Sequence, residues 1–168
     1  MKFTFVPDYY VDTFDCATVE FLTALGIKGI ILDVDNTLEP YEHPLPGEHV
    51  VSWLSSLSAA GIKAVIVSNN NAERINLFNT KANLPAFSKA GKPFKKNLIK
   101  AMKIMNTSPD ETILMGDQVF TDVWAARNAG VRAILVPPIN DKCDPFTKFK
   151  RLLEKPVLRK YERKHGKR

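Results

Sequence analysis

Residues 29–40 read GIILDVDNTLEP, an apolar run that ends in two carboxylates one residue apart. The aliphatic residues that precede Asp33 predict a buried strand over 29–34. Asp33 and Asp35 carry like charges that repel each other, and a strand gains nothing from such a pair. Asp followed by Asn36 is also good turn chemistry, so this stretch taken alone fits a plain loop as well as a functional site.

Similar apolar runs recur along the chain and alternate with segments of helical spacing. Further strands are expected over 63–67, 112–115 and 132–136, and helices over 15–25, 49–61, 71–84, 93–105 and 121–130. Continuous apolar strands that alternate with helices predict an α/β fold, a doubly wound, Rossmann-like parallel sheet. In such sheets ligands bind beyond the carboxyl ends of the strands.

Polar side chains lie where these strands end or where a following helix begins. They are Asp33 and Asp35, Ser68 and Asn69, Lys92, and Asp117 and Asp122. If the loops converge, Asp33, Asp35 and Asp117 bring three acids together, with Asp122 near by. A hard divalent cation such as Mg²⁺ would offset their repulsion. A phosphate group bound through that metal would also satisfy the Ser68 hydroxyl and the Lys92 ammonium.

Such a site can hydrolyse a phosphate ester. A carboxylate can attack phosphorus to form an aspartyl-phosphate, while Mg²⁺ offsets the repulsion between the nucleophile and the anionic ester. A second carboxyl group can protonate the leaving alkoxide and later activate water. On this hypothesis Asp33 is the nucleophile and Asp35 is the general acid and base.

Four short motifs follow one another in this part of the chain: DVDNT (33–37), VSN (67–69), GKP (91–93) and GDQVFTD (116–122). Together they resemble the ordered motifs of the haloacid dehalogenase (HAD) superfamily of phosphatases. The resemblance spans residues 29–136. More narrowly, the short chain and the fourth motif, which begins with GDQ and ends with TD, are similar to subfamily IIIA members of the YqeG type. These members are related to mitochondrial phosphatidylglycerophosphatase.

The resemblance implies roles for the four acids. Asp33 would be the nucleophile and a Mg²⁺ ligand, and Asp35 would be the acid and base and would offer its backbone carbonyl to the metal. Asp117 would be a metal ligand, and Asp122 would support the metal site. Asp122 has a structural alternative, because Thr121-Asp122 is also good chemistry for the start of a helix.

The resemblance also implies that Ser68, with Asn69, and Lys92 hold the transferring phosphoryl group. Ser68 could instead cap its loop or the next helix, as could Asn69, Asn70 and Asn71. A separate physical argument also favours an anion near Lys92. Pro93 suits the first turn of a helix, so Lys92 is expected to lie at a helix N-terminus. Lysines there oppose the helix dipole, and a bound anion would relieve that conflict.

The intervals between motifs leave little room for a cap domain. Thr37 and His49 are only 12 positions apart, and Ser68 and Lys92 only 24, most of which the helix over 71–84 occupies. We therefore expect an open site. Such a site suits a phosphate carried on a lipid, a protein or a nucleic-acid end, unless an oligomer supplies the lid.

The charge of the chain is unevenly placed. Of the net +6, residues 148–168 contribute +8 from ten Lys/Arg and two Glu, so residues 1–147 sum to −2. We predict a phosphatase domain over 1–147 and a basic tail over 148–168, in which Pro156 interrupts any continuous helix. The tail could contact an anionic membrane, could be solvated and frayed, or could bind nucleic acid.

The composition indicates in which compartment of the cell the protein is expected. The chain has 168 residues, no Lys/Arg-led apolar segment at its start and no apolar run long enough to cross a membrane. Its two cysteines, Cys16 and Cys143, form no CxxC pair, which indicates a reducing cytoplasm. Any membrane contact would be peripheral, at the inner face.

The sequence thus predicts a capless, Mg²⁺-dependent HAD phosphatase, with phosphatidylglycerophosphate as the favoured substrate. One alternative is the same chemistry on a soluble phosphate ester or a phosphoprotein. Another is a binding module on an HAD scaffold whose basic tail docks RNA or a ribonucleoprotein. A third is a receiver-like domain that is phosphorylated as a signal.

Overall fold

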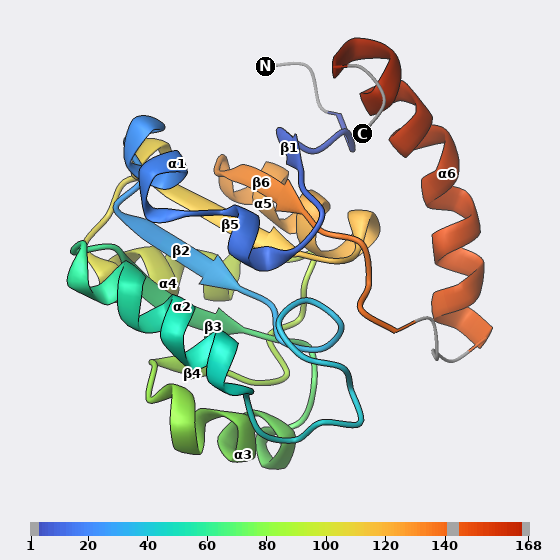
Figure 1. Ribbon diagram of the computed structural model, residues 1–168. Helices are drawn as coiled ribbons and strands as arrows, with labels where there is room; N and C mark the ends of the chain where they lie inside the picture. The colour runs from blue at the N-terminus through green and yellow to red at the C-terminus, as the bar shows by residue number, and fades with distance from the viewer. Residues whose placement is uncertain (1–3, 141–144, 166–168) are drawn as a thin grey trace.

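A six-stranded parallel sheet forms the centre of the protein, with helices on both faces (Figure 1). The computed structural model describes residues 4–140 and 145–165. The strands are β1 (Tyr9–Tyr10), β2 (Gly29–Leu32), β3 (Lys63–Val67), β4 (Ala86–Phe87), β5 (Thr112–Gly116) and β6 (Arg132–Leu135). Their order across the sheet is β1-β6-β5-β2-β3-β4, and every neighbouring pair is parallel. The predicted doubly wound α/β fold is confirmed.

Two buried clusters cover the two faces of the sheet. One face packs against α1 (Val19–Ala24), α2 (Glu48–Ala59) and α3 (Ala72–Ala82), and the other against α4 (Lys96–Met105), α5 (Trp124–Ala129) and α6 (Pro145–His165). Strand β2 alternates between them, because Ile30 and Leu32 point into the first cluster and Ile31 into the second. Burial on both faces explains why this strand is apolar throughout.

The central strand β2 aligns its carboxyl end with the ends of both neighbours. Leu32 lies opposite Ile66 of β3 and Met115 of β5. The chain leaves β2 toward β3 on one side and later returns to β5 on the other. The loops after these three strands therefore start side by side at one edge, where the order of strands reverses, as in other ligand-binding α/β sheets.

The predicted strands are confirmed, with ends that differ by no more than two residues. Strands β1 and β4 were not predicted, since each is two residues long and lies at an edge of the sheet. The connection over 38–47 is a short loop, so no large cap domain is present within the described residues.

The C-terminal segment forms α6, a helix of 21 residues that runs alongside the body (Figure 1). The prediction that Pro156 interrupts it was wrong. Pro156 is exposed, so the Leu152 carbonyl that loses its helical partner can be hydrated. Val157 and Leu158 pack against the second cluster. The Tyr161 hydroxyl accepts a hydrogen bond from the Tyr10 N–H at 3.1 Å.

None of the helices within the described ranges is long and apolar enough to span a bilayer.

Candidate active site

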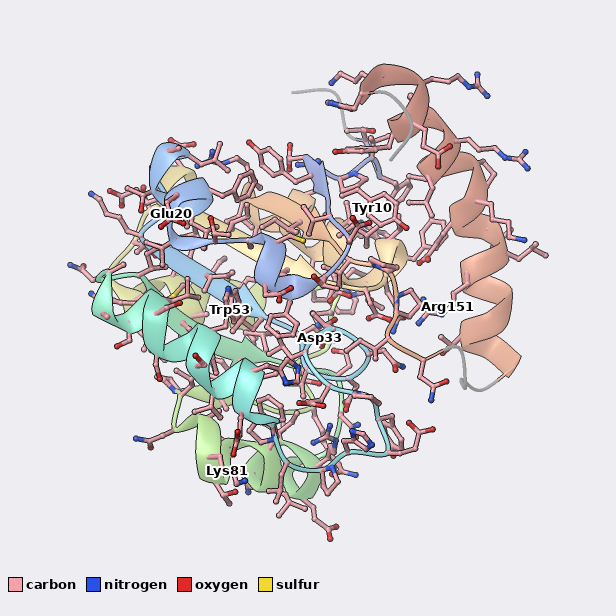
Figure 2. The ribbon with its side chains drawn as sticks, in the orientation of Figure 1. Tyr10, Glu20, Asp33, Trp53, Lys81 and Arg151 are labelled. Carbon is pink, nitrogen blue, oxygen red and sulfur yellow. The ribbon has the colours of Figure 1, made fainter. Side chains whose placement is uncertain are left out.

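Asp33 directly follows β2 and lies at the carboxyl edge of the sheet (Figure 2). Its backbone N–H continues the sheet by donating to the Met115 carbonyl at 3.0 Å. Its side chain is nearly buried, and Oδ1 accepts a hydrogen bond from Lys92 Nζ at 2.7 Å. Strand β2 therefore fixes the backbone of this acid and Lys92 fixes its carboxylate.

Lys92 bridges two acids, with Nζ 2.7 Å from Asp33 Oδ1 and 2.6 Å from Asp122 Oδ1. Burial alone would lower the pKa of Lys92, but Asp122 and Asp33 outweigh burial and hold the pKa above its usual range. The prediction that Lys92 crowds a helix N-terminus was wrong, because α4 begins only at Lys96. Lys92 is placed by its ion pairs and by the loop that carries it.

Asn69 holds that loop. Its side-chain amide donates to the Lys92 carbonyl at 3.0 Å and accepts from the Lys92 N–H at 2.7 Å. Ser68 follows β3 directly and is buried, and its hydroxyl accepts from the Asn70 N–H at 3.2 Å. Neither residue caps the next helix, since Asn71 is the N-cap of α3. Phosphate binding by Ser68 and Asn69 stays a prediction.

Three buried acids meet at this edge. Asp33, Asp117 and Asp122 each offer one carboxylate oxygen, and these atoms lie within 4.8 Å of one another. Burial raises the pKa of Asp33 to about 6, and Asp122 adds to the rise while Lys92 opposes it. Burial also raises the pKa of Asp117 to about 8, with Asp122 and Asp33 adding to it. The three acids are paired with two cations, Lys92 and Arg151, so when all three are ionised one buried negative charge is left without a counterion.

The cluster fits a divalent metal ion. Asp117 Oδ1 is buried and has no hydrogen-bond partner, and an unsatisfied buried carboxylate oxygen needs a cation or a donor. The atoms that the three acids offer are carboxylate oxygens, which is the kind of donor that Mg²⁺ prefers. Asp33, Asp117 and Asp122 could therefore hold Mg²⁺.

A π-helix, η3 (Val119–Val123), carries Asp122 into this cluster and leads into α5. The alternative in which Thr121 caps a helix was wrong, because Gln118 is the N-cap of η3, whereas the placement of Asp122 as an acid in the first turn is confirmed. Asp122 Oδ2 accepts from the Gln118 N–H at 3.1 Å, so one oxygen is held locally while Oδ1 meets Lys92. Gly116 makes the approach possible, since a Cβ there would lie 2.2 Å from Asp122 Cγ.

Asp35 stands apart from the three-acid cluster. Its Oδ1 accepts from Arg74 Nε at 3.0 Å and lies 2.9 Å from Arg74 Nη2, and its Oδ2 accepts from Asn70 Nδ2 at 2.8 Å. Arg74 also donates to the Pro44 carbonyl at 2.8 Å, which ties the 38–47 loop to this acid. The side chain of Asp35 thus lies outside the three-acid cluster, and binding of a metal by its backbone carbonyl stays a prediction.

Sequence reasoning missed Arg74, Asn70 and Arg151. Arg74 lies in the first turn of α3, three residues after a cap, where its position gives no sign of a partner. Arg151 comes from α6 and lies 2.7 Å, through Nη2, from Asp117 Oδ2. The sequence showed it only as one of many basic residues near the C-terminus, and 34 residues separate it from Asp117.

We expect the metal-free protein to lose stability as pH rises from about 5 to about 8.5. Asp33 and Asp117 have folded-state pKa values of about 6 and about 8, above the ordinary value near ~4. The folded state therefore keeps protons that the unfolded chain releases. This contribution to stability is fully present below the unfolded pKa and is lost as pH rises through the folded values. Thermal melts in EDTA across this range measure the fall in Tm.

Two controls assign the fall to the acids. Asp117→Asn removes one of the two raised groups and should flatten the profile. Mg²⁺ binds the ionised carboxylates, so it should raise Tm more at about pH 8.5 than at about pH 5.5. An equal rise at both pH values would contradict the assignment.

Comparison with known proteins identifies the family of this chain. A family model for haloacid dehalogenase-like hydrolases matches residues 27–136. "Probable phosphatase YqeG" of Bacillus subtilis is 35% identical over 164 residues, which cover 98% of this chain and 95% of the relative. The resemblance stated from the four motifs is confirmed.

Two more distant proteins extend the comparison. "Phosphatidylglycerophosphatase GEP4, mitochondrial" of Saccharomyces cerevisiae is 24% identical over 161 residues, which cover 88% of this chain and 86% of the relative. The cobalt-bound structure of deoxy-D-mannose-octulosonate 8-phosphate phosphatase from Haemophilus influenzae superposes with a TM-score of 0.56 at 15% identity. It covers 82% of this chain and 90% of its own. This structure shows a shared fold.

Proposed function

We propose that this chain, which belongs to the haloacid dehalogenase-like hydrolase family of phosphatases, hydrolyses a phosphate monoester through an aspartyl-phosphate on Asp33. The observation that carries the proposal is the buried arrangement in which Lys92 joins Asp33 to Asp122, with Asp117 within 4.8 Å. The third acid, Asp117, pairs with Arg151 through Oδ2, but its buried Oδ1 has no hydrogen-bond partner, which an ion-pair network alone does not explain.

The reaction has two steps at Asp33. A carboxylate oxygen of Asp33 forms a bond to phosphorus while the bond from phosphorus to the ester oxygen breaks, and Asp35 gives its proton to the leaving oxygen. Asp35 then takes a proton from water, whose oxygen attacks phosphorus and releases Asp33 and inorganic phosphate. Lys92 orients Asp33 and stabilises charge on the transferring phosphoryl group.

Asp33, Asp117 and Asp122 would hold the Mg²⁺ ion. When bound, the ion supplies positive charge that offsets the repulsion between the Asp33 carboxylate and an anionic ester. Arg74 and Asn70 hold the Asp35 carboxylate, so this acid is oriented before substrate arrives.

We favour phosphatidylglycerophosphate as the substrate. Within the described residues the site has no large cap, and exposed apolar side chains occur in the neighbouring loops: Tyr41, Leu45, Phe94 and Ile139. Phe94 lies two residues after Lys92, and the Ile139 N–H donates to the Asn36 carbonyl at 3.0 Å. An apolar rim of this kind suits a lipid whose phosphate reaches the site. The similarity to the yeast phosphatidylglycerophosphatase supports the same choice.

The outer side of α6 suits an anionic membrane. Leu152 and Leu153 are exposed there, and so are five basic residues of the same helix: Lys155, Arg159, Lys160, Arg163 and Lys164. Basic residues near an anionic surface each contribute about 1 kcal/mol, and neighbouring apolar side chains can enter the interface. We therefore propose peripheral contact with an anionic bilayer through this face of α6.

The activity test is Mg²⁺-dependent phosphate release from phosphatidylglycerophosphate in mixed micelles, beside a panel of soluble phosphate esters. Faster release from the lipid than from every soluble ester supports the full proposal. Release from soluble esters alone keeps the phosphatase chemistry and rejects the lipid. No release from any ester contradicts the proposed reaction.

Membrane contact has its own test. The double variant Arg159→Gln/Arg163→Gln should bind vesicles that contain anionic lipid about 30-fold more weakly than the wild type. This expectation takes about 1 kcal/mol for each lost charge. Co-sedimentation with vesicles measures the binding. The matched control, Lys81→Gln/Lys103→Gln, removes two exposed charges from other helices and should bind normally. Salt-sensitive RNA binding without vesicle binding would contradict the membrane partner.

A further inference from the structure

The last helix of the chain brings Arg151 to the candidate metal site. Arg151 Nη2 lies 2.7 Å from Asp117 Oδ2, and both side chains are largely enclosed, with 15% and 1% of their surface exposed. Figure 2 shows Arg151 on the side of α6 that faces the body. This ion pair therefore joins the C-terminal helix to a carboxylate of the three-acid cluster.

A second buried contact fixes α6 at this place. Glu154 lies one turn after Arg151 and is only 4% exposed. Its Oε1 accepts a hydrogen bond from the Val119 N–H at 2.8 Å. Val119 is the first residue of η3 and follows Asp117 by two positions. Arg151 and Glu154 thus hold the segment that carries Asp117 and Asp122 at two points.

The two oxygens of Asp117 differ in their surroundings. Oδ2 is taken by the Arg151 guanidinium, whereas Oδ1 is buried without a hydrogen-bond partner. A carboxylate that binds a metal through one oxygen is oriented by what binds the other, and such outer partners strongly affect metal affinity. The planar guanidinium is well suited to this task, since its donors are held in a rigid fork.

We propose that Arg151 is a positioning residue that orients Asp117 for Mg²⁺, so that helix α6 is a part of the active site. The inference rests on the proposed metal site. Arg151 acts through Asp117 and need not touch the substrate. The C-terminal helix then contributes twice, with its inner side to the metal ligand and its outer side to the proposed membrane contact.

Calorimetric titration of the full chain with Mg²⁺ tests the inference. Arg151→Gln should raise the Kd for Mg²⁺ by about 10- to 100-fold, the usual cost of losing an outer partner of a metal ligand. Lys81→Gln and Lys103→Gln remove exposed charges from other helices and should leave the Kd unchanged. Activity of Arg151→Gln should recover as Mg²⁺ is raised, which damage to the fold would not allow.

The outcomes separate this inference from the proposed function. An unchanged or lower Kd in folded Arg151→Gln would overturn it, and a lower Kd would show that the guanidinium competes with the ion. If Arg151→Gln does not fold, Arg151→Lys decides. A weaker Mg²⁺ affinity of Arg151→Lys would support the inference, because lysine lacks the rigid fork of the guanidinium. Wild-type Mg²⁺ affinity of Arg151→Lys would overturn the inference. A wild-type protein that binds Mg²⁺ but releases no phosphate would contradict only the proposed reaction, whereas one that binds no Mg²⁺ would overturn the inference.

Discussion

Asp33→Asn is expected to lower kcat for phosphate release by about 10⁵-fold, because removing a nucleophile leaves only the surrounding binding groups to act. Asparagine has nearly the shape of aspartate, and its side-chain oxygen can still accept the hydrogen bond from Lys92 at this buried position. The loss should therefore reflect chemistry and not a change of fold. Phosphate release measures kcat. Mass spectrometry of acid-quenched enzyme should detect the added phosphoryl group on wild-type Asp33 and on no other residue.

The thermal behaviour of this variant provides an internal check. Burial and the neighbouring Asp122 disfavour the charged form of Asp33 in the metal-free protein. Removal of its charge should thus keep or raise Tm in EDTA. Asp110→Asn changes an exposed acid and serves as the matched control, with wild-type kcat expected. An Asp33→Asn enzyme within 10-fold of wild-type kcat would contradict nucleophilic attack by this residue.

The parts of the site that could be predicted from sequence are those set by local order. The apolar run before Asp33 predicts a strand, and the run before Asp117 predicts a second one. Parallel strands bring their carboxyl ends to one edge, so the convergence of Asp33 and Asp117 follows without coordinates. Lys92 was also predicted for the site, although the reason given was wrong, since it precedes α4 and is placed by its two ion pairs.

The parts that could not be predicted depend on contacts between distant segments. Arg151 and Asp117 are 34 residues apart, and no periodicity relates them. Arg74 and Asp35 are 39 residues apart, and a helix surface normally carries such an arginine in solvent. The predicted interruption at Pro156 was wrong, because an exposed proline can be accommodated in a helix whose inner side is held by packing. Docking of its inner side supports α6 across Pro156, and the many Leu, Lys, Arg and Glu residues of the segment are themselves good helix formers.

The arginine that holds Asp35 bears on what this acid can do. The carboxylate accepts from Arg74 and Asn70 on separate oxygens, which fixes its orientation at the mouth of the site. A general acid and base must reach the leaving oxygen in the first step and water in the second. The carboxylate is held ready for the base task of the second step, whereas the first step requires that Asp35 carries a proton when the ester binds.

Asp35→Asn is expected to lower kcat for an alkyl phosphate by about 10³-fold, within the usual range for loss of a general acid and base. With p-nitrophenyl phosphate the first step should suffer less, because p-nitrophenolate leaves without a proton. Hydrolysis of the aspartyl-phosphate still needs activated water, so the phosphorylated enzyme should accumulate.

Rapid mixing of Asp35→Asn with p-nitrophenyl phosphate should therefore show a burst of p-nitrophenol close to one equivalent per enzyme, followed by slow turnover. Arg74→Gln keeps the acid but removes the two Arg74 contacts to Oδ1, and we expect a smaller loss of about 10-fold without a burst. A variant that slows both substrates equally and shows no burst would mean that Asp35 does not act as the acid in the first step and the base in the second. The contact between Arg74 and Asp35 would then act to fix the 38–47 loop, which Arg74 also contacts through the Pro44 carbonyl.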